Sequence, residues 1–294
     1  MKHWIEAMRL RTLPLALACI GMGAVLALSD GSFNSLIFLL CCLTTISLQI
    51  LSNLANDYGD SIHGADNADR LGPLRAVQSG VITSSKMRKA VIITSVLSLI
   101  FGIMLLVVSD ISMKMFIGFI ILGLIAIAAA ILYTNGKLPY GYHGLGDLSV
   151  FLFFGLLAVL GTYFLQTKSL DLTLLLPASS CGLFAVAVLN INNIRDIKSD
   201  KIAGKHSLPV MLGLKKAKIY HLLLLFTGLA TSIIYVMLDY NSINELLFLL
   251  VMPLLILNGL RVYKSESEKS LDPLLKQMAL TTLLFVILFG ISIN

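Results

Sequence analysis

Long apolar runs separated by short polar segments dominate the pattern of side chains along this chain. The runs cover roughly residues 13–29, 35–56, 90–109, 112–133, 147–166, 172–192, 217–238, 244–261 and 273–292. A helix needs about 20 consecutive apolar residues to cross the hydrocarbon core of a bilayer. The pattern therefore predicts nine membrane-spanning helices.

The composition also favours a membrane protein. Hydrophobic residues make up 57% of the 294 residues and charged residues 13%, whereas soluble globular domains are about 25% charged. We therefore expect an all-α, polytopic bundle in which residues 1–294 form a single transmembrane domain. The basic head and first apolar run resemble a signal peptide, but we interpret them as a retained first span because many equally apolar segments follow.

Lysine and arginine are distributed unequally between the connecting segments on the two sides of the predicted bundle. One set carries 20 of the 22 basic residues, and the opposite set carries Lys114 and Lys168. Cytoplasmic loops are enriched in lysine and arginine, so we predict a cytoplasmic N-terminus in the cell inner (cytoplasmic) membrane. The long connections, about 57–89 and 193–216, are then cytoplasmic, and we expect the active site there. The net charge of +6 reflects this topology, so no nucleic-acid partner is expected.

Two polar clusters follow the second and sixth apolar runs. The first extends from Asn53 to Asp66 and the second from Asn190 to Asp200. Within each cluster, asparagine and aspartate recur every four residues, a spacing that places them on one face of a helix. Four spans separate the clusters, so both lie on the same side of the membrane. A parallel repeat of this kind places a site at the interface between its halves.

These clusters predict a metal site. Unscreened carboxylates about 4 Å apart repel by roughly 4 kcal/mol at an effective dielectric constant near 20. Mg²⁺ takes one or two carboxylates and completes its shell with water and substrate phosphates, so two such ions would let two acidic walls hold one diphosphate. The expected metal ligands are Asn56, Asp60, Asp66, Asn192, Asp196 and Asp200. The alternative is that these residues are solvated loop residues or helix caps.

Other polar residues near the clusters are candidates for binding and catalysis. Basic side chains would donate hydrogen bonds to an anion held by the metals, although the positive charge of cytoplasmic loops also explains them. These side chains are Arg70, Arg75, Arg195, Lys198 and Lys205. Tyr133 and Lys137 form a Tyr-x-x-x-Lys pair whose ends could reach a charged intermediate and a phosphate. We also expect Asp57, Asp60, Asp196 and Asp200 to be catalytic and Asn53 and Tyr58 to contact substrate.

Together these motifs resemble the UbiA superfamily of intramembrane prenyltransferases, in particular the subfamily that prenylates 1,4-dihydroxy-2-naphthoate in menaquinone synthesis. The supporting stretches run through nearly the whole chain: Trp4–Pro14, Asn53–Asp60, Gly64–Asp66, Arg70–Arg75, Gly144–Ser149 and Gly204–Leu208. The chain departs from the superfamily pattern at Gly64, where an aspartate is common, and at Ala55, where some members carry a phosphate-binding arginine. Arg75 is a candidate substitute for that arginine.

The resemblance implies Mg²⁺-dependent transfer of a polyprenyl group from an allylic diphosphate to an aromatic acceptor. For dihydroxynaphthoate, the acceptor carboxylate leaves as CO₂ and the product is demethylmenaquinone. The allylic cation would be sheltered by Tyr58, Tyr133 and Phe153 or Phe154, and Arg9 or Arg11 would pair with the acceptor carboxylate. The prenyl tail would lie in an apolar groove open to the bilayer. Neither the prenyl length nor the oligomeric state follows from the sequence.

Three alternatives remain. Within the superfamily, the acceptor could be 4-hydroxybenzoate or a haem or chlorophyll precursor. A transporter of a metal–anion complex also uses repeats and acidic residues, but its acids usually lie deep in the membrane rather than at helix ends. The CDP-alcohol phosphotransferases use membrane aspartates and Mg²⁺, but their pattern requires a glycine after the second aspartate, where this chain has Ser61.

Overall fold

The computed structural model describes residues 2–63 and 75–294, and every regular element within them is helical. The first half comprises α1 (Lys2–Met8), η1 (Leu10–Thr12), α2 (Leu13–Ser29), α3 (Ser35–Ile62), α4 (Ser84–Val108), α5 (Met113–Leu132), η2 (Tyr140–His143), α6 (Gly146–Val150), the π-helix η3 (Phe151–Leu157) and α7 (Ala158–Thr167). The second half comprises η4 (Leu172–Leu174), α8 (Leu175–Arg195), α9 (Ile197–Ile202), α10 (Leu208–Leu212), α11 (Leu214–Met237), η5 (Ile243–Val251), α12 (Met252–Lys264), η6 (Glu268–Leu271) and α13 (Asp272–Ile293).

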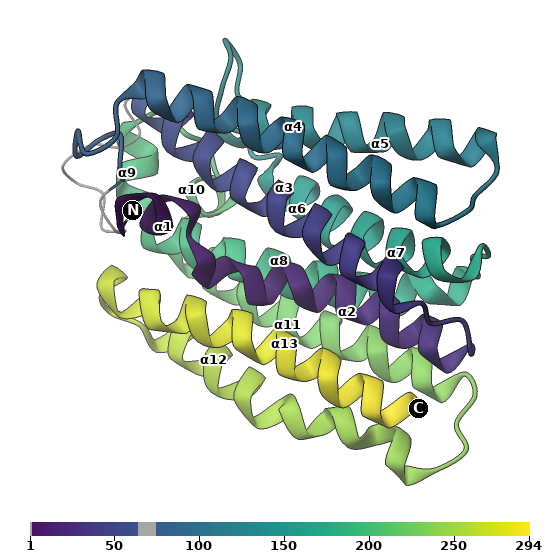
Figure 1. The fold of residues 1–294 in the computed structure, drawn as a ribbon. Coiled ribbons are helices and arrows are strands. Elements are labelled where there is room, and N and C mark those ends of the chain that lie inside the picture. Colours follow the sequence, from purple (N-terminus) through teal and green to yellow (C-terminus); the bar gives the residue numbers. More distant parts are fainter. Residues whose placement is uncertain (1, 64–74) are drawn as a thin grey trace.

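These elements form a bundle of long helices that lie side by side (Figure 1). In the part of the chain that is described, nine helical segments are long and apolar enough to cross a membrane. The predicted all-α fold with nine spans is thereby confirmed. The short helices α1, α9 and α10 gather at one end of the bundle, and the C-terminus lies at the opposite end (Figure 1). We call the end that carries α1, α9 and α10 the polar end.

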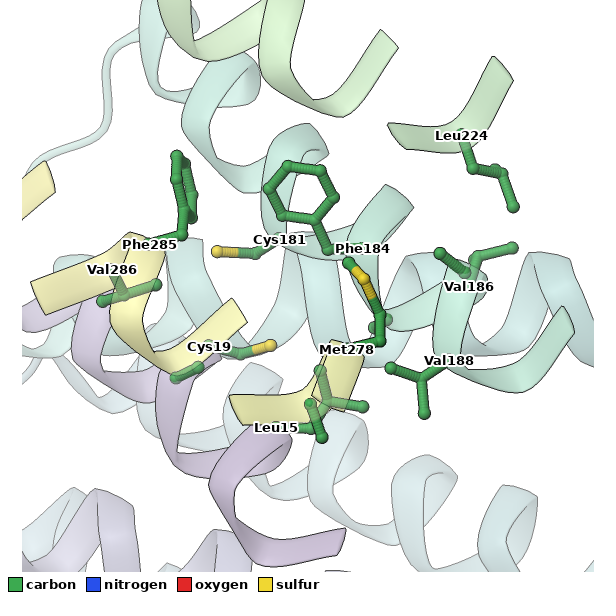
Figure 2. Close-up of a cluster of buried hydrophobic side chains, with 14 of the residues drawn as sticks. Leu15, Cys19, Cys181, Phe184, Val186, Val188, Leu224, Met278, Phe285 and Val286 are labelled. Carbon is green, nitrogen blue, oxygen red and sulfur yellow. The ribbon is translucent and has the colours of Figure 1, made fainter. Parts of the chain in front are cut away.

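The centre of the bundle is built from α2, α8 and α13. In each of these three helices, more than half of the most apolar stretch is buried. In α5, almost none of the most apolar stretch is buried. Figure 2 shows Phe184 of α8 and Phe285 of α13 among the central apolar side chains, and their rings meet edge to face with centroids 5.1 Å apart. Close packing of this kind holds membrane helices together where lipid is as apolar as the helix surface.

One contact in the bundle brings two backbones unusually close. A Cβ atom on Gly155 of η3 would lie 2.7 Å from the Cα of Gly182 on α8. Small residues permit such approaches between membrane helices. The π-helical turn that contains Gly155 is a form that occurs often near functional sites, and here it lines the cavity described below.

The first polar cluster lies in the last turns of the long helix α3. The helix has 28 residues, which corresponds to about 42 Å at 1.5 Å per residue, whereas the hydrocarbon core is about 30 Å thick. Its first turn is capped by the Asn34 side chain, which accepts hydrogen bonds from the backbone N–H groups of Leu36 and Ile37. The helix is therefore longer than an untilted span requires, and its extra turns carry the cluster at the polar end.

Candidate active site

Two residues of the first cluster fasten neighbouring segments to α3. The Asn53 amide donates hydrogen bonds to the Met8 carbonyl oxygen at 2.9 Å and to Thr12 Oγ1 at 3.1 Å, which joins the N-terminal segment to the helix. The Asp57 carboxylate accepts from the backbone N–H groups of Ala76 and Val77 at 3.1 and 3.2 Å. Both side chains are buried. Their predicted roles in substrate binding and catalysis stay predictions.

Asp60 lies one turn further along α3 in a buried polar environment. One carboxylate oxygen lies 2.5 Å from Nη2 of Arg75, and the other accepts a hydrogen bond of 2.8 Å from the hydroxyl of Tyr142. The Asp57 contacts hold the backbone directly after Arg75, so Asp57 helps to place the arginine that pairs with Asp60. Asn56 Oδ1 accepts a hydrogen bond from Thr134 Oγ1 at 3.2 Å.

The second cluster is organised around Arg195 at the end of α8. Its Nε and Nη2 donate to the two carboxylate oxygens of Asp196 at 2.9 and 2.7 Å. Nη2 also donates to Asn192 Oδ1 at 2.8 Å, and Nη1 donates to Asp272 Oδ1 at 2.6 Å. The Arg195 side chain is 2% exposed, so carboxylate and amide oxygens take the place of water around its guanidinium group.

Asp200 forms the other part of this cluster. Its Oδ1 lies 3.5 Å from Lys205 Nζ, and its Oδ2 accepts a hydrogen bond of 3.2 Å from Ser207. Burial raises the pKa of Asp200, an effect that the nearby Lys205 ammonium partly opposes. Burial would by itself lower the pKa of Lys205, but the carboxylates of Asp200 and Asp60 outweigh it and raise that pKa above its ordinary value. Lys205 therefore stays protonated at neutral pH.

Tyr142 connects the two clusters. Its hydroxyl donates to Asp60, its ring lies 5.7 Å from Lys205 Nζ, and its carbonyl oxygen accepts from the backbone N–H of His206 at 2.9 Å. The fold thus places the end of α3 and the segment that follows α9 on either side of one tyrosine. Two acidic segments 140 residues apart in sequence, at Asp60 and Asp200, meet at the polar end.

A cavity of about 360 Å³ extends into the bundle beside Asn53 and Asn56 of the first cluster. Asn56 and Tyr133 line its polar end, and Cys41 and Leu165 line it deeper in the bundle. Burial raises the pKa of Tyr133 to about 12, and its ring meets that of Tyr140 edge to face with centroids 5.3 Å apart. The predicted cation-sheltering residues Phe153 and Phe154 also line this cavity.

The remaining predicted residues lie around the edge of the cluster or outside the described part of the chain. Lys137 and Lys198 are exposed, and Tyr58 is half-buried. Arg9 adopts a left-handed backbone conformation, and Arg11 lies 3.3 Å from Asp272. Asp66 and Arg70 fall outside the described residues.

The donor chemistry of the two clusters fits Mg²⁺. In the described residues, no group of three or more histidine, cysteine, aspartate or glutamate side chains gathers as a metal site. Mg²⁺ does not require such a group, because it is bound by one or two carboxylates with water and phosphate oxygens. Beside Asn192, the buried amide oxygen Oδ1 of Asn193 has no hydrogen-bond partner. The predicted ligands therefore offer the hard carboxylate and amide oxygen atoms that Mg²⁺ prefers.

Neither Asp272 nor Tyr142 is among the site residues predicted from the sequence. Asp272 begins the last apolar run and resembles an ordinary first-turn helix residue. Tyr142 lies in a loop between spans, where tyrosine usually marks the membrane interface. The short distance between Tyr142 and Asp60 depends on tertiary contacts that no local pattern encodes.

The fold is shared with solved membrane proteins. A UbiA homolog from Aeropyrum pernix aligns over 93% of this chain and 94% of its own, with a TM-score of 0.68 and 18% sequence identity. A UbiA homolog from Archaeoglobus fulgidus bound to DMAPP and Mg²⁺ aligns over 97% of this chain and 98% of its own, with a TM-score of 0.63 and 18% identity. These likenesses show that the bundle shares its fold with these membrane proteins.

Sequence comparison identifies the family. The model of the UbiA prenyltransferase family matches residues 16–287. The chain is 47% identical to an Escherichia coli protein named 1,4-dihydroxy-2-naphthoate octaprenyltransferase, over 97% of this chain and 94% of that protein. It is 45% identical to a Haemophilus influenzae protein of the same name, over 100% of this chain and 96% of that protein. The chain belongs to the UbiA prenyltransferase family and is a membrane prenyltransferase, which confirms the resemblance seen in the sequence.

The role of Asp57 as an anchor is testable with Asp57→Asn. An amide can accept a hydrogen bond through one atom only, so the substitution leaves one of the two backbone N–H groups without its acceptor. We expect a loss of about 1–3 kcal/mol in the free energy of unfolding, together with lower turnover because Arg75 is less firmly placed. Thermal unfolding and activity in detergent measure both effects. Asp239→Asn, at an exposed position, is the control, and equal behaviour of the two variants would exclude the anchoring role.

Proposed function

We propose that this enzyme transfers a polyprenyl group from an allylic diphosphate to 1,4-dihydroxy-2-naphthoate in a Mg²⁺-dependent reaction that releases CO₂. The observation that carries the proposal is a long, mainly apolar cavity whose lining includes Asn53 and Asn56, each one helical turn of α3 before a buried aspartate, Asp57 or Asp60. An allylic diphosphate has the same division, with a charged head and an apolar tail. The names of the relatives support the choice of acceptor.

The charged head of the donor would bind between the two clusters. Arg75, Arg195 and Lys205 are buried cations that can donate charge-assisted hydrogen bonds to phosphate oxygens. The ligands for Mg²⁺ would be Asn56, Asp60, Asn192, Asp196 and Asp200. When bound, a divalent ion supplies Lewis-acid charge that stabilises the leaving diphosphate.

The apolar tail would occupy the cavity. Asn56 and Cys41, both on α3, line it and are 15 residues apart, which corresponds to about 22 Å along the helix axis. Its outer wall is formed by α4 and α5, the most lipid-exposed of the spans. A chain that enters between these helices can therefore extend from the charged head towards the bilayer.

Bond breaking and bond making then follow from this placement. The allylic C–O bond breaks, and its electron pair leaves with the diphosphate. Tyr133 and Tyr140 present aromatic rings near the polar end of the cavity, where they can stabilise the allylic cation, and the apolar walls exclude water. The acceptor ring forms the new C–C bond, and the electron pair of the carboxylate C–C bond returns to the ring as CO₂ leaves.

The orientation of the enzyme completes the proposal. The distribution of lysine and arginine favours a cytoplasmic polar end in the inner membrane, where water-soluble acceptor and diphosphate are exchanged. Arg9 or Arg11, which lie in the N-terminal segment beside this end, would then pair with the acceptor carboxylate.

An acceptor panel tests the proposed reaction. Purified protein is incubated with Mg²⁺, a polyprenyl diphosphate and, separately, 1,4-dihydroxy-2-naphthoate, 4-hydroxybenzoate or haem. Of the three acceptors, we expect only dihydroxynaphthoate to give release of diphosphate and CO₂. Turnover should be lost when the metal is removed by chelation. Transfer to 4-hydroxybenzoate at a comparable rate would contradict the acceptor assignment, and undiminished turnover after chelation would contradict the metal requirement.

The cavity assignment is testable at Gly161 of α7, where a Cβ atom would lie 3.7 Å from Phe119 inside the cavity wall. The larger side chain of Gly161→Leu would extend into the space proposed for the tail. We expect kcat/KM for a long polyprenyl diphosphate to fall about tenfold, because overpacking typically costs about 1–3 kcal/mol. The value of kcat/KM for geranyl diphosphate should stay close to that of the wild type. Gly118→Leu, at a position where a Cβ atom meets nothing within 4 Å, is the control. An equal loss for short and long donors would place the tail elsewhere.

A further inference from the structure

Asp272, the first residue of α13, joins two arginines that the chain brings together from distant segments. Its Oδ1 accepts a hydrogen bond of 2.6 Å from Arg195 Nη1, and its Oδ2 lies 3.3 Å from Arg11 Nη1. The Asp272 side chain is 39% exposed, whereas that of Arg195 is 2% exposed. The carboxylate thus connects a buried cation with a partly exposed one.

Arg195 in turn holds the oxygen atoms that are proposed to bind metal. It contacts both carboxylate oxygens of Asp196 and the amide oxygen of Asn192. A guanidinium group and a divalent ion cannot share the same lone pairs at full strength. A metal bound to these oxygens competes with Arg195 for their negative charge, so binding of the metal–diphosphate would weaken the contacts of Arg195 with Asp196 and Asn192.

The cost of that exchange depends on what remains beside Arg195. Removing the partner of a buried charge is strongly destabilising, because the charge is left without compensation in a medium of low dielectric constant. Asp272 is a second carboxylate already in contact with the guanidinium. When Asp196 and Asn192 turn towards a metal, Arg195 therefore keeps an ionic partner.

We propose that Asp272 is a positioning residue that lowers the cost of metal binding by keeping Arg195 paired while Asp196 and Asn192 become ligands. The inference rests on the proposed function, since it assumes that these oxygens bind Mg²⁺ with diphosphate. It predicts that loss of the Asp272 charge strengthens the hold of Arg195 on Asp196 and weakens metal binding. Asp272 itself need not touch metal or substrate.

The test is a Mg²⁺ titration of the full-length protein in detergent at a fixed excess of inorganic diphosphate, followed by the midpoint of thermal unfolding. We expect Asp272→Asn to raise the half-saturating Mg²⁺ concentration about tenfold, the fold-change that corresponds to one charge-assisted hydrogen bond. Asp272→Glu, which keeps the carboxylate, should restore a value close to that of the wild type. Glu266→Gln removes one exposed negative charge before α13 and should leave the value unchanged.

A double-mutant comparison separates this role from a structural one. In an Arg195→Gln background, Asp272→Asn should cause no further change in Mg²⁺ response, because the two residues act through the same contact. If Asp272→Asn lowers the unfolding midpoint without metal but leaves the half-saturating Mg²⁺ concentration unchanged, the carboxylate serves only the helix terminus and the inference is wrong. If the wild-type protein shows no Mg²⁺-dependent stabilisation, the proposed metal chemistry fails first, and the inference fails with it.

Discussion

The pairing of buried carboxylates with buried cations at the polar end is the interaction on which this structure depends. Asp60, Asp196 and Asp200 are each at most 6% exposed, and each lies within 3.5 Å of an arginine or lysine nitrogen. Buried charges of one sign repel strongly and are tolerated only with such partners. The cations therefore compensate the negative charge of the acids.

Under the proposed function, this arrangement would let one cluster accept both a metal and an anion. Each cation that neutralises an acid can also donate hydrogen bonds to a phosphate oxygen. A metal–diphosphate would add positive charge to the acids and negative charge to the cations, so the charge balance of the cluster would be retained. Binding would then proceed by exchange of ionic partners within a buried environment.

The sequence was sufficient to predict the helical architecture and the location of the polar clusters. Apolar runs of about 20 residues predict spans because a backbone in lipid must satisfy its hydrogen bonds within a helix. The spacing of asparagine and aspartate placed two clusters at the ends of spans, and the structure brings these ends together. Both predictions depend on local periodicity, which a sequence displays directly.

Individual partners could not be predicted in the same way. The contacts of Tyr142 with Asp60 and of Asp272 with Arg195 join residues more than 75 positions apart, and they depend on how whole helices pack. Asn53 is predicted to contact substrate, and its amide also joins α3 to the N-terminal segment, a contact that no local pattern indicates. Local patterns indicate which residues lie at the polar end, whereas tertiary packing decides which of them touch.

The central claim is that the two clusters together hold one diphosphate through Mg²⁺. The most direct measurement is an experimental structure of the protein with Mg²⁺ and a non-ionising thio-analogue of the allylic diphosphate. The account predicts metal density between Asp60 of α3 and the Asp196 and Asp200 carboxylates that follow α8, with Arg75 and Arg195 turned towards phosphate oxygens and the prenyl tail inside the cavity. A diphosphate bound elsewhere, with both arginines still paired to the same aspartates, would contradict it.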